Sequence, residues 1–188
     1  MKNQATAIPP RRRVRLSFYL LFGLLGVFAA LVGFGYTYLA PIATGRLEVP
    51  LGVHFHGIIS AVWILLYALQ SILIRRRKFI YHRQLGYFGV FILVGFTLSL
   101  FTVGDFVVQR GLQQGDGDFA YNQLIGVLTS GRWVLILGLL DVYYRRRPRL
   151  HKICMFLATA VILWPAYSLE ARAYKLSPNG STTYLPNV

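Results

Sequence analysis

Five long hydrophobic runs divide the chain, and short polar connections with glycine, proline or clustered charges separate them. A helix that spans a membrane needs about 20 mostly apolar residues, and every run meets that length. The pattern therefore predicts an all-α, polytopic transmembrane helical bundle with five spanning helices. The five runs are Leu16–Ala40, Val53–Ile74, Leu85–Val108, Tyr121–Tyr144 and Leu150–Ala173.

Polar segments flank this bundle at both ends. We expect residues 1–15 to form a basic cytoplasmic segment, residues 16–174 a single five-helix membrane domain, and residues 175–188 an exposed polar tail. The first hydrophobic run is longer than the core of a signal peptide, which has about 7 to 15 residues. We interpret it as a retained first helix.

Composition and charge support a membrane protein. Of the 188 residues, 55% are hydrophobic and 14% are charged, whereas roughly a quarter of the residues in a soluble domain are charged. The net charge of +14 lies in clusters directly beside the hydrophobic runs, and not on an aromatic-rich basic face of the kind that binds nucleic acid. We therefore expect the lipid bilayer, and no nucleic acid, as a partner. The single cysteine, Cys154, excludes an internal disulfide.

The charges also predict an orientation. Lysine and arginine concentrate on the cytoplasmic side of membrane proteins. Fifteen of the twenty such residues lie in the N-terminal segment and in the second and fourth connections, and five of the six acidic residues lie on the opposite side. We expect a multi-pass protein of the bacterial inner (cytoplasmic) membrane, with its N-terminus in the cytoplasm and its C-terminus outside.

The second and fourth hydrophobic runs begin an internal repeat of tryptophan, apolar run, three arginines and histidine. Trp63 to Arg75 and Trp133 to Arg145 are both twelve steps, and the next histidine follows each tryptophan after nineteen or eighteen steps. The matched spacing favours a pseudo-duplicated four-helix core, with helices two and three superposing on four and five and helix one at the edge. Alternatively, any two hairpins that face inward share an arginine cluster.

A polar stripe follows one face of the second helix, at steps of four, three, four and three residues. Hydrogen-bonding side chains do not favour lipid, so this face should point into the bundle. It either lines an outward-facing ligand pocket or ties helices together through hydrogen bonds. The stripe consists of His56, Ser60, Trp63, Tyr67 and Gln70.

Arg132 lies about midway along the fourth helix, where an arginine costs at least about 2.5 kcal/mol on an isolated helix. It either completes the pocket as an anchor for an anionic group, or forms a structural ion pair with Asp105 or Glu170. Asp141, near the inner end of the same helix, is expected to pair with the neighbouring arginines.

The four histidines form two pairs. His82 and His151 lie at the inner starts of helices three and five, and two histidines on different helices at one depth can be the axial ligands of a b-type haem. Each also lies beside a cation at the water boundary, where a histidine needs no ligand. His54 and His56 could bind an outer metal ion if the chain there is extended, because residues two apart on a helix point in different directions.

No hydrolase, ATPase or dinucleotide-binding motif is present, so the sequence does not assign an enzyme activity. The hairpin around His56, Gly57, Trp63 and Gln70, continued by His82, Arg83, Leu85 and Gly86, resembles a group of small, largely uncharacterised bacterial multi-pass membrane proteins. Its His-Arg-x-Leu-Gly element is also similar to pieces of ferric-reductase-like and cytochrome b561-like membrane domains. Those families bind b haems through histidine pairs within helices, and this chain has no such mid-helix pair.

Three functions are compatible with these patterns. The first is a non-catalytic binding or accessory protein, or a subunit of a larger membrane complex, whose outward-facing pocket holds a lipid, a quinone or a small ligand. The second is a redox protein with haem b on His82 and His151 that exchanges electrons with a quinone. The third is a small transporter that uses the repeat and Arg132.

Overall fold

A computed structural model describes residues 17–45 and 49–173, and this part of the chain is helical with short connections. The expected N-terminal segment 1–15 and tail 175–188 lie outside the described residues. The elements are α1 (Phe18–Phe34), a π-helical turn (Gly35–Leu39), α2 (Ala40–Ala43), α3 (Leu51–Arg75), α4 (Phe79–Gln113), α5 (Asp118–Tyr143), a 3-10 turn (Tyr144–Arg146) and α6 (Pro148–Ala173).

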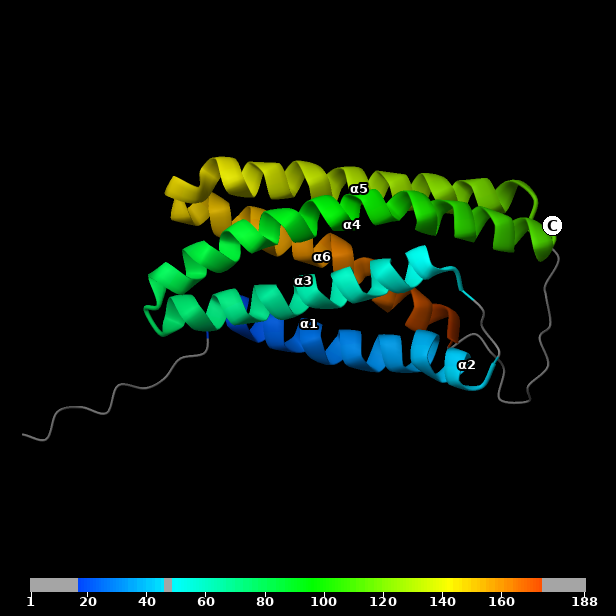
Figure 1. Cartoon of the computed structure of the whole chain (residues 1–188), viewed down its shortest axis with the longest axis horizontal. Coiled ribbons are helices and arrows are strands. Elements are labelled where there is room, and N and C mark those ends of the chain that lie inside the picture. Colours follow the sequence, from blue (N-terminus) through cyan, green and yellow to red (C-terminus); the bar gives the residue numbers. More distant parts are fainter. Residues whose placement is uncertain (1–16, 46–48, 174–188) are drawn as a thin grey trace, which may run out of the picture.

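The long helices pack side by side as a bundle (Figure 1). Neighbouring pairs are α1 with α3, α3 with α4, α4 with α5, α5 with α6, and α6 with α1, so the helices close into a ring. A further contact between α3 and α6 crosses the middle of that ring. The prediction of an all-α helical bundle is confirmed.

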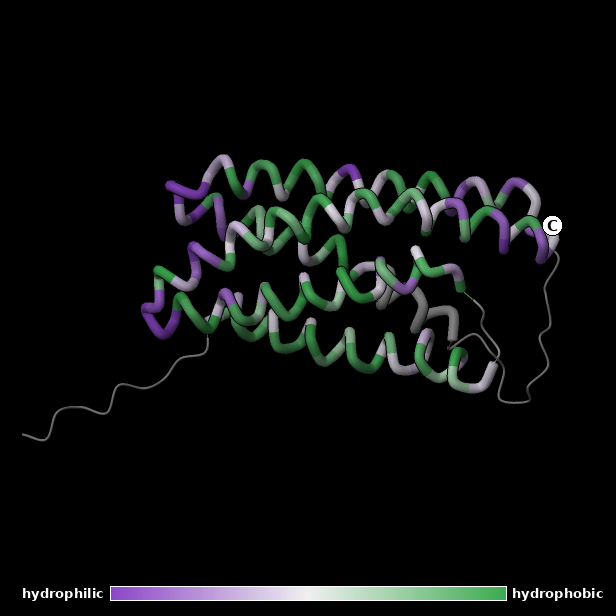
Figure 2. The backbone as a smooth tube through the Cα atoms, viewed as in Figure 1, coloured by the Kyte–Doolittle hydropathy of each residue, from purple (hydrophilic) through white to green (hydrophobic). Residues whose placement is uncertain are grey.

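Three of the described helices are long and apolar enough to cross a membrane: α3, α4, and α5 with its 3-10 extension. Large apolar side chains such as Phe28, Phe91 and Phe101 are exposed on the outside of the bundle, as expected for a surface that faces lipid. Figure 2 shows the hydropathy along the chain, with mostly hydrophobic helix centres and hydrophilic residues gathered at the helix connections.

Helix α4 is longer than the sequence predicted. The expected span, 85–108, extends by six residues at the start and five at the end, so that only residues 76–78 and 114–117 remain as connections on its two sides. The flanking segments contain residues with good helix propensity, including Arg, Gln and Leu. Positive φ angles at Arg77 (56°), Gly115 (80°) and Gly117 (52°) then turn the chain.

The first hydrophobic run is also not one regular helix. Its α-helical part ends at Phe34, and the π-helical turn Gly35–Leu39 leads into the short α2. At the other end of the chain, Pro148 is the first residue of α6, where its missing N–H would have no helical partner and its fixed φ suits the helix.

Glycines let α4 and α5 approach closely along most of their shared length. A Cβ atom on Gly131 would collide with Leu100, and one on Gly138 would collide with Leu93. A Cβ on Gly104 would lie 2.6 Å from Leu124. These leucines therefore occupy the space above the glycines, and they fix the register of one helix against the other.

We call these glycine–leucine contacts between α4 and α5 the seam. The bundle interior beside the seam is apolar and buried. Trp63, Leu93, Phe96 and Val134 belong to one buried cluster that joins α3, α4 and α5, and Ala158 of α6 completes it. A second, smaller cluster holds α1 against α3 and α6 through Ala30, Ile64 and Leu163.

The seam can be tested with a matched pair of substitutions in α5. Gly138→Val places two methyl groups where Leu93 lies, whereas nothing lies within 4 Å of a Cβ on Gly126. Both changes alter helix propensity equally. The difference between their unfolding free energies should therefore come from overpacking of Gly138→Val against Leu93, which costs about 1–3 kcal/mol. We expect Gly138→Val to lower the melting temperature in detergent well below that of Gly126→Val. Equal melting temperatures would contradict the close contact.

Candidate histidine site at the basic end

The two turns that join α3 to α4 and α5 to α6 lie at the same end of the bundle, which we call the basic end because arginines crowd both turns (Figure 2). His82 lies in the first turn of α4, and His151 lies in the first turn of α6. The helices after the two turns therefore carry one histidine each at the same depth.

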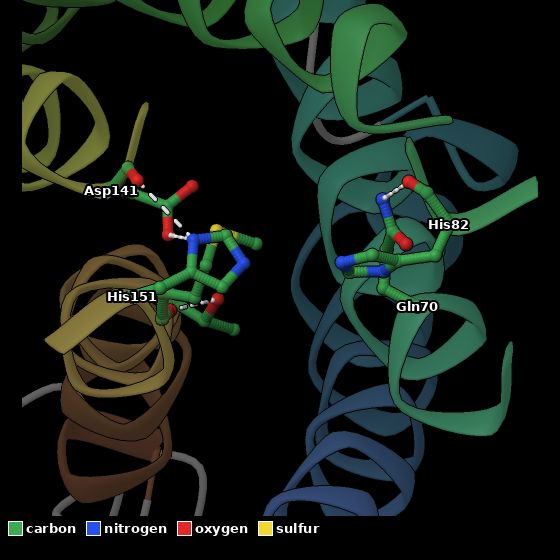
Figure 3. Close-up of polar contacts among 6 residues, drawn as sticks. Gln70, His82, Asp141 and His151 are labelled. Atoms are coloured by element: carbon green, nitrogen blue, oxygen red, sulfur yellow. Dashed lines mark hydrogen bonds and ion pairs between the residues drawn. The ribbon is translucent and has the colours of Figure 1, made fainter. Parts of the chain in front are cut away.

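The structure brings these two histidines together. Their ring centroids are 6.1 Å apart and their ring planes are nearly perpendicular, at 88°. Figure 3 shows the two imidazoles pointing toward one another from separate helices, with Gln70 beside His82 and Asp141 beside His151. Their sequence separation of 69 residues is closed only by the packing of the two hairpins.

Asp141 orients His151. The imidazole Nδ1 of His151 lies 2.6 Å from carboxylate Oδ1 of Asp141, and it donates a hydrogen bond of 3.2 Å to the backbone carbonyl of the same residue. Both oxygens are acceptors, so Nδ1 carries a proton. In the neutral imidazole, Nε2 then has a free lone pair. The expected pairing of Asp141 with arginines is therefore corrected: its partner is a histidine.

His82 is held through its backbone and leaves its ring available. Nε2 of Gln70 donates a hydrogen bond of 3.1 Å to the backbone carbonyl of His82. Besides Oδ1 of Asp141, which forms the ion pair with His151, two buried polar atoms here have no hydrogen-bond partner among the described residues: Nδ1 of His82 and Oε1 of Gln70. The buried hydroxyl of Tyr67, whose ring packs against Phe22 of α1, has none either. Because a buried polar group without a partner is costly, such a group often marks a site that binds something.

The residues around the histidine pair are more exposed than those at the bundle centre. His82 and His151 are half-buried, and the first turns of α4 are mostly exposed. The close glycine contacts between α4 and α5 end at Leu93 and Gly138, three helical turns from His82. In Figure 1 the start of α4 lies beside α3, apart from the end of α5.

The donor set suits a ligand that needs only two protein atoms. Within the described residues, no group of three or more His, Cys, Asp or Glu side chains could hold a bare metal ion. The two imidazoles face each other instead, as two axial ligands of one central atom would.

The part of the polar stripe nearest the start of α3 makes its hydrogen bonds inside the protein. Nδ1 of His56 and the hydroxyl of Ser99 are 2.8 Å apart. The hydroxyl of Ser60 donates to the backbone carbonyl of His56 at 2.7 Å. The first contact ties α3 to α4, which is the structural alternative for His56, whereas the second lies within α3.

Trp63 joins α3 to α6 through a partner that is 96 residues away in the sequence. Its indole Nε1 donates a hydrogen bond of 3.1 Å to the hydroxyl of Thr159 on α6, and both residues are fully buried. Thr159 was not predicted as a site residue, and its position among the apolar residues of the last run gave no pattern that could have identified it. Trp133, the counterpart of Trp63 in the repeat, is exposed on α5.

Arg132 does not join the stripe. It is exposed on the outside of α5, with its guanidinium carbon 6.0 Å from the ring centroid of Trp133. Asp105 is exposed on α4 and accepts a hydrogen bond from Gln109. Among the described residues no ion pair joins Arg132 to Asp105, and the Glu170 side chain lies outside them. The expected pocket that includes Arg132, Asp105 and Glu170 is therefore not assembled by the described residues.

The hypothesis of a metal ion on His54 and His56 is also not supported. Both residues lie in the regular helix α3, so their rings point in different directions. His54 contacts the hydroxyl of Tyr38 at the end of the first hydrophobic run, whereas His56 contacts Ser99 on α4.

These observations define a helical bundle with an exposed apolar surface that suits contact with lipid, and with a facing pair of histidines between two hairpins. Comparisons with protein-family models, with curated proteins and with solved structures find no match for this chain.

The link between α3 and α6 can be tested by comparing the two tryptophans of the repeat. Trp63→Phe removes a buried indole and leaves the Thr159 hydroxyl without its donor, so we expect a loss of about 2 kcal/mol in unfolding free energy. Trp133→Phe alters an exposed side chain and should change stability by less than about 0.5 kcal/mol. Denaturation followed by near-ultraviolet circular dichroism would measure both. A similar loss in the two variants would contradict this assignment.

Proposed function

We propose that this chain is a membrane-bound electron carrier that holds a b-type haem at its basic end, with His82 and His151 as the axial ligands. The observation that carries the proposal is the facing pair of imidazoles, 6.1 Å between centroids, supplied by two different hairpins. When bound, haem iron supplies one-electron oxidation and reduction.

The spacing of the rings agrees with this role. Imidazole nitrogens bind a first-row metal at about 2.0 Å, so two rings on opposite sides of one metal have centroids roughly 6 Å apart. A porphyrin provides four nitrogens of its own, and two protein ligands therefore suffice.

Asp141 supports the same role through His151. A histidine that binds a metal usually donates its other ring N–H to a carboxylate or a carbonyl, which fixes the tautomer and the ring orientation. His151 has both acceptors in Asp141, through Oδ1 and the backbone oxygen. This arrangement leaves Nε2 as the nitrogen that would bind iron.

The charge at the basic end suits the anionic part of a haem. Haem carries two propionates, and guanidinium groups bind carboxylates through paired hydrogen bonds. Arg76 and Arg77 flank the α3–α4 turn, and Arg146 and Arg147 flank the α5–α6 turn. Either turn can supply a propionate partner close to the histidines.

We place this carrier in a bacterial inner membrane with five crossings: α1 with its π turn and α2, then α3, α4, α5 and α6. The basic end faces the cytoplasm according to the positive-inside rule. The two hairpins, α3–α4 and α5–α6, form a pseudo-duplicated core in which each second helix carries one ligand. A quinone in the bilayer or another subunit of a membrane complex would exchange electrons with the haem.

The outward-facing ligand pocket and the small transporter remain hypotheses from the sequence. The polar stripe of α3 supports the pocket, but His56, Ser60 and Trp63 make their described hydrogen bonds to the protein itself. This pattern favours a role in joining helices for that part of the stripe.

The haem site predicts a spectrum. Protein purified in detergent should show the sharp reduced absorption bands of a six-coordinate b haem after dithionite, and His82→Ala and His151→Ala should each abolish them. Asp141→Asn should weaken haem retention by about 10-fold or more, because it alters the group that orients His151.

His54→Ala is the matched control for these variants, because this histidine lies at the opposite end of α3 and should leave the spectrum unchanged. Colourless protein after expression with added haem precursor, or bands that persist without both His82 and His151, would overturn the proposal. In that case the Asp141–His151 pair is a structural staple between α5 and α6.

The five-helix topology predicts the locations of the connections. A reporter enzyme that is active only outside the cytoplasm should be active when inserted at residues 114–117 or fused after Val188. It should be inactive when inserted at residues 76–78, and a cytoplasmic fluorescent reporter should give the opposite pattern. A cytoplasmic C-terminus would mean an even number of crossings and would refute the five-helix count.

A further inference from the structure

Two opposite charges are exposed on the outer surface of the α4–α5 hairpin. Arg132 is the fifteenth residue of α5, and Asp105 is the ninth residue from the end of α4. Figure 2 shows hydrophilic colour interrupting the middle of α5, where Arg132 lies. Both side chains are exposed, on a hairpin whose helices are long and apolar enough to cross a membrane.

The two charges lie at different depths, and Arg132 is the one that cannot easily leave the hydrocarbon core. At 1.5 Å per residue, Arg132 lies about 21 Å from the start of α5 and about 16 Å from its end. Asp105 lies about 12 Å from the end of α4. The core is about 30 Å thick and α4, with 35 residues, is about 52 Å long, so part of α4 lies outside the core and Asp105 lies toward its outer boundary. Arg132 lies near the middle of α5, where lipid offers no partner for an ion.

Among the described residues, no ion pair joins the two charges or gives either of them another partner of opposite charge. Asp105 accepts a hydrogen bond from Gln109 on its own helix, and Arg132 lies over the ring of Trp133 on its own helix. A ring and an amide compensate only part of a charge in a low-dielectric environment, because an ion in hydrocarbon needs a counter-ion or several hydrogen bonds.

Packing contacts give the relative depth of the two residues. Leu100 of α4 lies over Gly131 of α5, and Leu124 of α5 lies over Gly104 of α4. Because the two helices are antiparallel, these contacts put Arg132 level with residues 96–99 of α4, and Asp105 lies about 9 to 14 Å closer to the outer end of the bundle. An arginine side chain extended toward that end reduces this difference.

We propose that two copies of the chain associate through the α4–α5 hairpin, with Arg132 of each copy paired to Asp105 of the other. Both copies have the same orientation in the membrane, so the two-fold axis lies along the membrane normal. A two-fold interface is self-complementary, and it forms both ion pairs at once. One exposed cation and one exposed anion on neighbouring helices are the minimal set for such an interface.

The remainder of the face is suited to helix packing. Leu98 and Phe101 are exposed beside Asp105, and Ile125 and Leu128 are exposed beside Arg132.

Charge reversal provides a test that separates pairing from simple damage. Two copies with different affinity tags are expressed together, solubilised in mild detergent, and purified through one tag. Wild-type copies should co-purify. Arg132→Asp alone and Asp105→Arg alone should each abolish co-purification, because like charges would meet at both contacts. A mixture of one Arg132→Asp copy and one Asp105→Arg copy should restore it, because both ion pairs form again.

Arg110→Asp is the matched control, since Arg110 is exposed near the outer end of the same hairpin. It should co-purify like the wild type. The neutral variants Arg132→Gln and Asp105→Asn should co-purify at least 5-fold less than the wild type, and they keep the test valid if a reversed copy fails to fold. Wild-type copies that remain monomeric, or a mixed pair that does not recover, would overturn the proposal and assign this face to lipid or to a different protein.

Discussion

Close packing between α4 and α5 is the constraint on which the rest of the bundle depends. Leucine side chains seated over glycines bring the two helices together and permit one register between them. Because α3 precedes α4 through a short turn and α6 follows α5 through another, this register also fixes the relative height of α3 and α6. The meeting of His82 with His151 is a consequence of that height, since neither residue belongs to the seam.

The two ends of α3 show how the same type of residue serves different purposes. Toward one end, His56 and Ser60 find hydrogen-bond partners within the bundle, and Trp63 reaches α6. Toward the basic end, buried atoms of Tyr67, Gln70 and His82 have no such partner among the described residues. A protein interior normally satisfies its buried polar groups, so this contrast distinguishes the part of the stripe that holds helices together from the part next to the proposed haem.

Charged residues within the apolar helices occupy two kinds of environment, the bundle interior and its outer surface. Asp141 is buried and lies against His151, which compensates its charge inside the bundle. Arg132 and Asp105 are instead exposed on the outer surface of α5 and α4. One pair thus lies in the interior, and the other two charges lie on the surface where we propose that two copies associate.

The sequence by itself determined the helical class and the position of each long helix, because runs of about 20 apolar residues are compatible with little else. It also indicated that His82 and His151 share a depth. Only the tertiary structure decided that these rings face each other, that Asp141 contacts His151 rather than an arginine, and that Arg132 points outward. Hydrophobic periodicity on a uniformly apolar helix does not specify which side faces the bundle, and contacts such as Trp63 with Thr159 connect residues 96 positions apart. Those choices depend on side-chain packing between helices, which no single segment of the sequence contains.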